Sequence, residues 1–210
     1  MKLYYAPGSC SLAPHIALRE AGLAFRLEEM HPKTHTLADG RDFYAINELG
    51  YVPLLELENG MILHEGPAIM QFIADQVPEA QLAPANGTME RYVLQEWLNF
   101  LTSEIHKGYI PIFYAVAAQQ YLSLARSKLM KRFAWLDTQL AGKTYLMGEV
   151  FSVADAYLYA LTNWGRADWI RSVYNLDVDL NGFAHLAAWH ARVHARPAVQ
   201  QALEAEGLAA

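Results

Sequence analysis

The hydrophobic pattern of this 210-residue chain changes character once, near residue 80. Before this point, short segments of alternating polarity are interleaved with segments of helical spacing, whereas beyond it we find only helical spacing. Residues 78–88, PEAQLAPANGT, are rich in proline, glycine and small residues and are typical of a linker. We therefore predict an α/β domain over residues 1–80 and an all-helical domain over residues 87–210.

The segments of the first domain have an order that restricts its fold. The predicted strands are 2–5, 25–30, 53–58 and 61–64, and the predicted helices are 11–22, 43–47 and 68–77. Asn59-Gly60 is a strong hairpin signal, because both residues of such a turn adopt positive φ. A parallel βαβ unit, a polar loop over 31–42 and then ββα form the thioredoxin-like arrangement. In the second domain we predict helices over 89–117, 121–141, 153–168, 183–196 and 198–206.

Composition and charge exclude several classes of function. The net charge is −6 and the sequence has no block of Lys and Arg, so the basic surface of a nucleic-acid binder is missing. No run approaches the ~18 apolar residues of a membrane span. Cys10 is the only cysteine, which suits a reducing compartment. We expect a soluble cytoplasmic protein that binds neither nucleic acid nor membranes.

Cys10 lies where a strand-to-helix loop meets the first predicted helix. Free backbone N–H groups and the helix dipole stabilise a thiolate there, so we expect a lowered pKa and a reactive sulfur. The alternative is a small buried residue, since free cysteine is often buried. Position 13, where a redox C-x-x-C motif has its second cysteine, is Ala13. A monothiol in this fold must pair with an external thiol, of which glutathione is the abundant one.

Three further residues near this loop are candidates for binding. The hydroxyls of Tyr5 and Ser11 could each stabilise a bound thiolate, although an ordinary strand aromatic and a helix N-cap each explain them better when taken singly. Glu65 opens the third helix, where its carboxylate could hold an amine while the helix amides hold a carboxylate. An acid in a first helical turn also simply complements the dipole.

The helical domain contains three more patterns. At ~100° per residue, Asn99, Ser103 and His106 share one narrow face, which weakly suggests the lining of a site. His190 and His194 have metal-binding spacing, but no third ligand is evident, and two surface histidines explain them better. Ser152 and Asp155 form a capping box, which is structural.

Together these residues resemble the bacterial beta-class glutathione S-transferases, over essentially the whole chain. The matching stretches are MKLYYAPGSCSLAPHIALREAGL, NELGYVPLLELENGMILHEGPAI, EWLNFLTSEIHKG, FSVADAYL and ARPAVQQALEAEGL. The resemblance implies a homodimeric enzyme that conjugates the thiol of glutathione to electrophilic small molecules and that can exchange thiols through Cys10. Glutathione is a co-substrate in this class, and neither a further cofactor nor a metal is implied.

The resemblance also assigns roles to particular residues. The implied catalytic residues are Cys10, His106, Ser11 and Tyr5. The implied glutathione-binding residues are Cys10, His35, Val52, Pro53, Glu65, Gly66, Asn99, Ser103, Glu104 and His106, with Pro53 following a cis peptide bond and some of the helical residues coming from the partner subunit. The implied electrophile pocket comprises Lys107, Tyr109, Phe113, Tyr114 and Trp164.

Two departures from the class affect the glutathione site. His35 stands where the class usually has Lys to meet the glycyl carboxylate, and Gly66 stands where it usually has Ser. Two other functions therefore remain open: glutaredoxin-like thiol–disulfide exchange, in which Cys10 attacks, and a non-catalytic scaffold that binds a protein partner.

Overall fold

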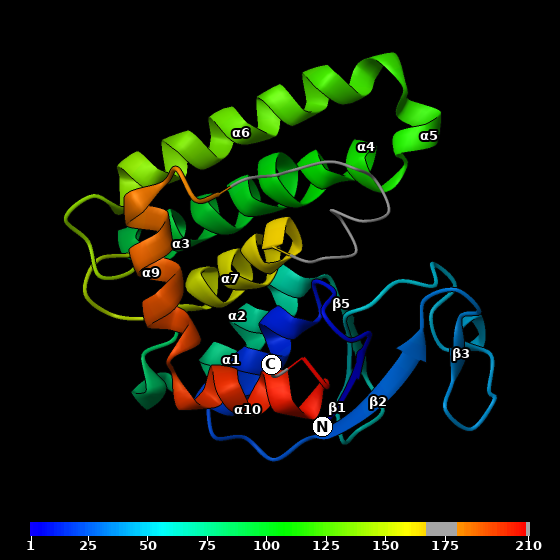
Figure 1. Ribbon diagram of the computed structural model, residues 1–210. Helices are drawn as coiled ribbons and strands as arrows, with labels where there is room; N and C mark the ends of the chain where they lie inside the picture. The colour runs from blue at the N-terminus through cyan, green and yellow to red at the C-terminus, as the bar shows by residue number, and fades with distance from the viewer. Residues whose placement is uncertain (167–179, 209–210) are drawn as a thin grey trace.

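The computed structural model describes residues 1–166 and 180–208, and Figure 1 shows a sheet packed beside a larger helical part. The sheet has the strand order β3-β2-β1-β4-β5, with β1 and β2 parallel and the other pairs antiparallel. The strands are β1 (Lys2–Tyr5), β2 (Arg26–His31), β3 (Thr36–Leu37), β4 (Leu54–Glu56) and β5 (Ile62–His64). This is the predicted thioredoxin-like order. The two-residue strand β3 lies within the segment that was expected to be a loop.

Side-chain alternation in β1 separates the two faces of the sheet. Leu3 and Tyr5 belong to the main core, whereas Tyr4 packs in a smaller cluster with Phe43 and Leu54. Phe43 begins the short helix η1 (Phe43–Ala45), which is held at its start by the side chain of Asp42. Helices α1 (Leu12–Glu20) and α2 (Gly66–Gln76) pack together on the main-core side.

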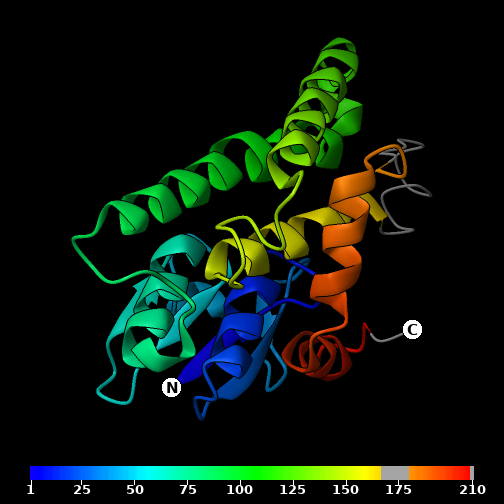
Figure 2. The same cartoon turned by 90° about the vertical axis from the view of Figure 1, so that its left-hand side faces the viewer.

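The remaining helices form the second part of the fold, seen from another side in Figure 2. They are α3 (Met89–Phe100), α4 (Ile110–Phe113), α5 (Ala115–Ala118), α6 (Gln120–Leu140), α7 (Val153–Arg166), α9 (Ala184–His194) and α10 (Pro197–Ala205). Helices α7 and α10 both pack against α1, which joins the two parts through one core. None of the described helices is long and apolar enough to cross a membrane.

The predicted helix over 89–117 is not continuous, which corrects the sequence-based expectation. After α3 the chain forms a π-helix, η3 (Leu101–His106), and then a 3₁₀ turn, η4 (Lys107–Tyr109), before α4. The capping box is confirmed, because the carboxylate of Asp155 accepts hydrogen bonds from the amide and hydroxyl of Ser152. Residues 167 and 168 of the predicted helix over 153–168 lie outside the described residues.

Candidate functional site

The loop after β1 places Cys10 against the start of β4. The Sγ atom of Cys10 donates a weak hydrogen bond to the carbonyl oxygen of Val52, 3.4 Å away. The peptide bond between Val52 and Pro53 is cis, as the resemblance implied. The only sulfhydryl of the chain therefore lies beside the backbone that leads into this cis-proline bond.

The expectation of a lowered pKa at Cys10 is wrong. Burial raises the pKa of this thiol to about 12, because the charged form loses its hydration. The backbone N–H groups of Cys10 and Ser11 and the charge of Lys107 act in the opposite direction, and the charge of Glu65 adds to the rise. The helix dipole effect thus exists but is smaller than the cost of desolvation.

The two hydroxyl candidates near the loop belong to buried residues. Ser11 is fully buried, and its Oγ bonds to the backbone of Ala6 and to the hydroxyl of Ser9, 2.7 Å away. It lies at the N-cap of α1 but makes no side-chain capping bond. Tyr5 packs against the ring of His15, and burial raises the pKa of its phenol. Ser11 thus fixes the shape of the loop.

Glu65 and Gly66 lie at the N-terminus of α2. Glu65 is exposed and has a φ of 67°, so its backbone is in the left-handed region. A Cβ added to Gly66 would lie 3.6 Å from Pro53, at ordinary contact distance. The serine that is usual in the class would therefore fit here, and its absence is not imposed by space.

His35 lies beside Gly50, in the segment that leads to Val52 and Pro53. Its ring stacks on that of Tyr44 with 4.7 Å between centroids. Both rings pack over Gly50, where an added Cβ would lie only 2.5 Å from Tyr44 and 3.0 Å from His35. Since Gly50 is two residues before Val52, this glycine lets His35 approach the proposed glutathione backbone site.

The face predicted from Asn99, Ser103 and His106 has a different geometry in the structure, because the π-helix changes the angle between its residues. Asn99 and Ser103 are exposed and bond to the backbone one turn earlier. Glu104 instead forms an ion pair with Arg132 of α6, at 2.6 Å. Of the predicted face, Asn99 and Ser103 are thus exposed, whereas His106 is half-buried and contacts Tyr157 of α7.

His106 ends the π-helix and turns towards α7. Its Nδ1 atom lies 2.7 Å from the hydroxyl oxygen of Tyr157. Burial, with a smaller effect from the charge of Lys107, lowers the pKa of His106 to about 4. Tyr157 was missed in the sequence analysis, since it occupies an ordinary buried position of an amphipathic helix and its partner is 51 residues away.

Aromatic rings gather around His106. Trp164 is edge-on to His106, Tyr109 and Phe113, with centroid distances of 5.0, 5.4 and 5.2 Å. Tyr109 is fully buried, whereas Tyr114 is exposed. Of the predicted electrophile pocket, Tyr109 is thus part of the core in this conformation, while Phe113, Tyr114 and the exposed Lys107 retain solvent access.

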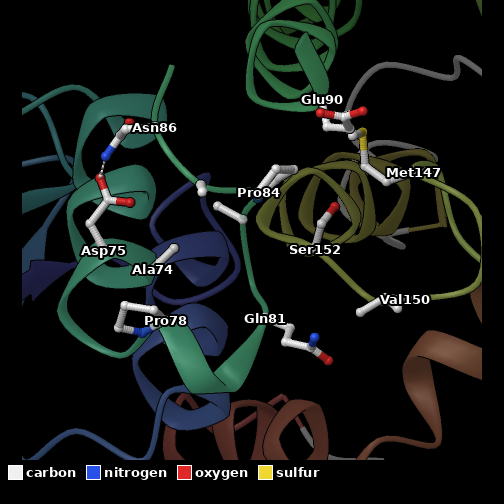
Figure 3. A pocket seen from close by; sticks show the side chains of 12 residues that line it. Ala74, Asp75, Pro78, Gln81, Pro84, Asn86, Glu90, Met147, Val150 and Ser152 are labelled. Carbon is white, nitrogen blue, oxygen red and sulfur yellow. Dashed lines mark hydrogen bonds between the residues drawn. The ribbon is translucent and has the colours of Figure 1, made fainter. Parts of the chain in front are cut away.

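A separate pocket lies on another part of the surface, between the linker, α2, the start of α3 and the segment before α7 (Figure 3). It has a volume of about 580 Å³ and is lined by Asp75, Pro84, Glu90 and Met147, among others. None of the residues proposed for the glutathione site lines it. We therefore place the candidate site at Cys10 and not at this pocket.

The prediction of two surface histidines on α9 holds for His194, which is exposed, and is wrong for His190, which is buried. His190 is buried, with Nε2 2.8 Å from Oδ1 of Asn163, and His194 has Nδ1 2.6 Å from the hydroxyl of Tyr159. Both are thus engaged with α7. Within residues 1–166 and 180–208, no group of three potential ligands could hold a metal ion.

The glutathione transferases share this architecture. They combine an all-helical second domain with a thioredoxin-like domain, in which the residue of the first loop faces a cis-proline turn. The N-terminal and C-terminal domain models of glutathione S-transferase match residues 8–76 and 92–197. The chain belongs to the glutathione S-transferase family and is a transferase enzyme.

The similarity extends over complete chains. Glutathione S-transferase GstA of Escherichia coli O157:H7 is 40% identical, with 99% of this chain and 100% of that protein covered. The ternary complex of BphK, a bacterial GST, is 48% identical with a TM-score of 0.91, covering 99% and 100% of the chains. The bacterial beta-class enzyme of Sphingomonas chungbukensis is 41% identical, also with a TM-score of 0.91 and coverage of 99% and 100%. These neighbours confirm the beta-class resemblance.

Proposed function

We propose that this enzyme conjugates the thiol of glutathione to electrophilic small molecules at Cys10. The observation that carries the proposal is the convergence of both domains on this thiol. The carbonyl of Val52 lies 3.4 Å from Sγ, and the charges of Glu65 and Lys107 both act on it. An extended peptide bound along Val52 would bring its own sulfur to the same place.

The proposed contacts follow the chemistry of the tripeptide. The γ-glutamyl end carries an amine and a carboxylate, which suit Glu65 and the amides that begin α2. The backbone of Val52 pairs with the central peptide, and His35 meets the glycyl carboxylate. Cys10 and His106 lie at the sulfur, where hydrogen-bond donors stabilise a thiolate. The electrophile is proposed to bind beside Phe113, Tyr114 and Lys107, with the buried ring of Trp164 behind Phe113.

We propose that the working unit is a homodimer. The start of α3 presents Met89, Tyr92 and Val93 on one face, with exposed fractions of 71%, 57% and 38%. Three large apolar side chains at helical spacing suit burial against a second copy. Asn99, Ser103 and Glu104 follow on the same helical segment and would serve a site that the two copies share. Sedimentation of the parent and of Tyr92→Glu tests this, since the parent should be dimeric and the variant weaker.

Thiol–disulfide exchange is a less favoured function of the same site. A thiol with a pKa of about 12 is ionised to only a small extent at neutral pH, so it is a poor attacking group. Cys10 is better suited to donate a hydrogen bond to the glutathione thiolate. A non-catalytic scaffold is the remaining alternative, because His35 and Gly66 remove one charge and one hydroxyl from the usual set.

The test compares two reactions and one binding measurement. Turnover of a haloarene with glutathione should exceed turnover of a glutathione mixed disulfide, and the reverse result would favour exchange. Cys10→Ala should abolish exchange and retain part of the conjugation. Calorimetry with glutathione decides the third alternative, because absence of binding at millimolar concentration would favour the scaffold.

The remaining proposals concern setting. We propose that the enzyme uses glutathione as its co-substrate and needs neither a metal nor a tightly bound cofactor. We also propose a cytoplasmic location, since a chain with a single cysteine and a function that needs reduced glutathione suit a reducing compartment. The domain limits of 1–80 and 87–210 likewise remain our proposal.

A further inference from the structure

His106, which is half-buried, and Tyr157, which is buried, form a pair between η3 and α7. The distance from Nδ1 of His106 to the tyrosine oxygen is 2.7 Å, and the two rings are nearly perpendicular at 81°. Only 3% of Tyr157 is exposed. A hydrogen bond this short to a buried hydroxyl holds the imidazole in one orientation.

The same pair is tied to the Cys10 loop. The ring of Trp164 packs edge-on against His106 at 5.0 Å, and its indole N–H donates to the carbonyl of Gly8 at 2.8 Å. Burial raises the pKa of Tyr157, a side-chain hydrogen bond with Thr102 lowers it, and smaller effects from Glu65 and from ionised Cys10 raise it. The phenol is therefore linked to the loop of the thiol chiefly through the contacts of His106 and Trp164.

Neither partner is ionised near neutral pH. Burial raises the pKa of Tyr157, and it lowers the pKa of His106 to about 4. The imidazole therefore carries one hydrogen, on either Nδ1 or Nε2. If the tyrosine hydroxyl donates to Nδ1, that hydrogen must be on Nε2, and the free edge of the ring is then a donor.

We propose that Tyr157 is a positioning residue that donates to Nδ1 of His106 and so fixes the tautomer whose Nε2–H group can donate to the glutathione thiolate. This inference rests on the proposed glutathione chemistry at Cys10. Tyr157 does not touch the substrate and acts through His106. The opposite tautomer would present a lone pair to the thiolate, which would repel it.

Nitrogen NMR of the unmodified protein tests the tautomer directly. With ¹⁵N-labelled histidine and glutathione bound, we expect His106 to show an unprotonated Nδ1 and a protonated Nε2. The signal is assigned by its loss in His106→Gln. A protonated Nδ1 would overturn the proposal, and this measurement does not depend on whether any Tyr157 variant folds.

Tyr157→Phe tests the consequence, and Tyr159→Phe is its matched control. Tyr159 lies on the same helix, is equally buried and has its hydroxyl 2.6 Å from Nδ1 of another histidine, His194. Tyr157→Phe should raise the pKa of bound glutathione, followed by thiolate absorbance, and lower kcat by about 10-fold to 100-fold, because the donor is misoriented and not removed. KM for glutathione and all Tyr159→Phe values should stay near those of the parent.

An unchanged kcat and thiol pKa in Tyr157→Phe would overturn the positioning role. Equal losses in the two variants would also overturn it, since they would indicate general loosening of α7. Failure of the parent itself to bind glutathione or to conjugate a haloarene would instead refute the proposed function, so the two ideas fail separately.

Discussion

Raising the pH from about 7 to about 10 should increase the rate at which Cys10 attacks a small aromatic disulfide by about tenfold per pH unit, without a plateau. The reason is that burial raises the pKa of the thiol to about 12. The reactive thiolate fraction then grows throughout this range. Because Cys10 is the only cysteine, the absorbance of the released aromatic thiol reports on this one residue.

The size of the effect can be worked out from the pKa. At about pH 8, a thiol with a pKa of about 12 is ionised in about one molecule in 10⁴, against about a quarter for an ordinary thiol with a pKa near ~8.5. Higher thiolate basicity recovers about 25- to 60-fold of this ~2,000-fold deficit. We therefore expect Cys10 to react about 40- to 100-fold more slowly than a free cysteine peptide.

Two substitutions provide opposite controls. The charge of Lys107 lowers the pKa of Cys10 and that of Glu65 raises it. Lys107→Gln should therefore slow the reaction, and Glu65→Gln should accelerate it. A plateau between about pH 7 and about pH 9 would refute the reasoning, because it would mean that the helix N-terminus outweighs burial.

Three other predictions concern stability and binding. Asp155→Ala should lower the free energy of unfolding in urea by about 3–5 kcal/mol. The reason is that the buried carboxylate of Asp155 accepts hydrogen bonds from two backbone amides, a hydroxyl and the Trp189 indole. A loss below ~1 kcal/mol would contradict this prediction. His106, with a pKa lowered from 6.5 to about 4, binds its proton more readily when unfolded. Stability should therefore be lost as pH falls from 6.5 towards 4, by an amount on the order of 3 kcal/mol, and urea unfolding of His106→Gln should lack this component. His35→Lys should tighten glutathione binding in calorimetry, because lysine would place a full positive charge opposite the proposed glycyl carboxylate. An unchanged affinity would exclude this role for position 35.

The strand order could be predicted because most strands carry their own signal. The short strand Lys2–Tyr5 is ended by Pro7-Gly8, and the Asn59-Gly60 turn indicates the final hairpin, although only Gly60 of this turn adopts positive φ. Strand β3 has only two residues, which is too short to show a period. The break after α3 was missed because the π-helix is only six residues long, which is too short for its wider turn to be distinguished from α-helical spacing in the sequence.

The candidate site was predicted as a set of residues but not as a set of interactions. The resemblance supplied Cys10, Val52 and His106, and the structure adds how each is held. The direction of the pKa shift at Cys10 could not be obtained from its place before a helix, because the dominant cause is burial. Tyr157 likewise gave no signal, since pairing with His106 depends on how α7 packs across η3.

The helical domain also determines the shape of the loop that carries the thiol. Gly8, with a φ of +68°, donates its N–H to Oε2 of Glu206 at 2.9 Å and accepts from the Trp164 indole at 2.8 Å. The other oxygen of Glu206 lies 2.8 Å from Nδ1 of His15. Because Arg19 donates to the remaining ring nitrogen of His15, Nδ1 carries the hydrogen that bonds to Glu206. Glu206 and Trp164 of the helical domain thus hold the backbone at Gly8, two residues before Cys10. Trp164 also packs on His106. The thiol of one domain and the imidazole of the other are therefore aligned by the same indole.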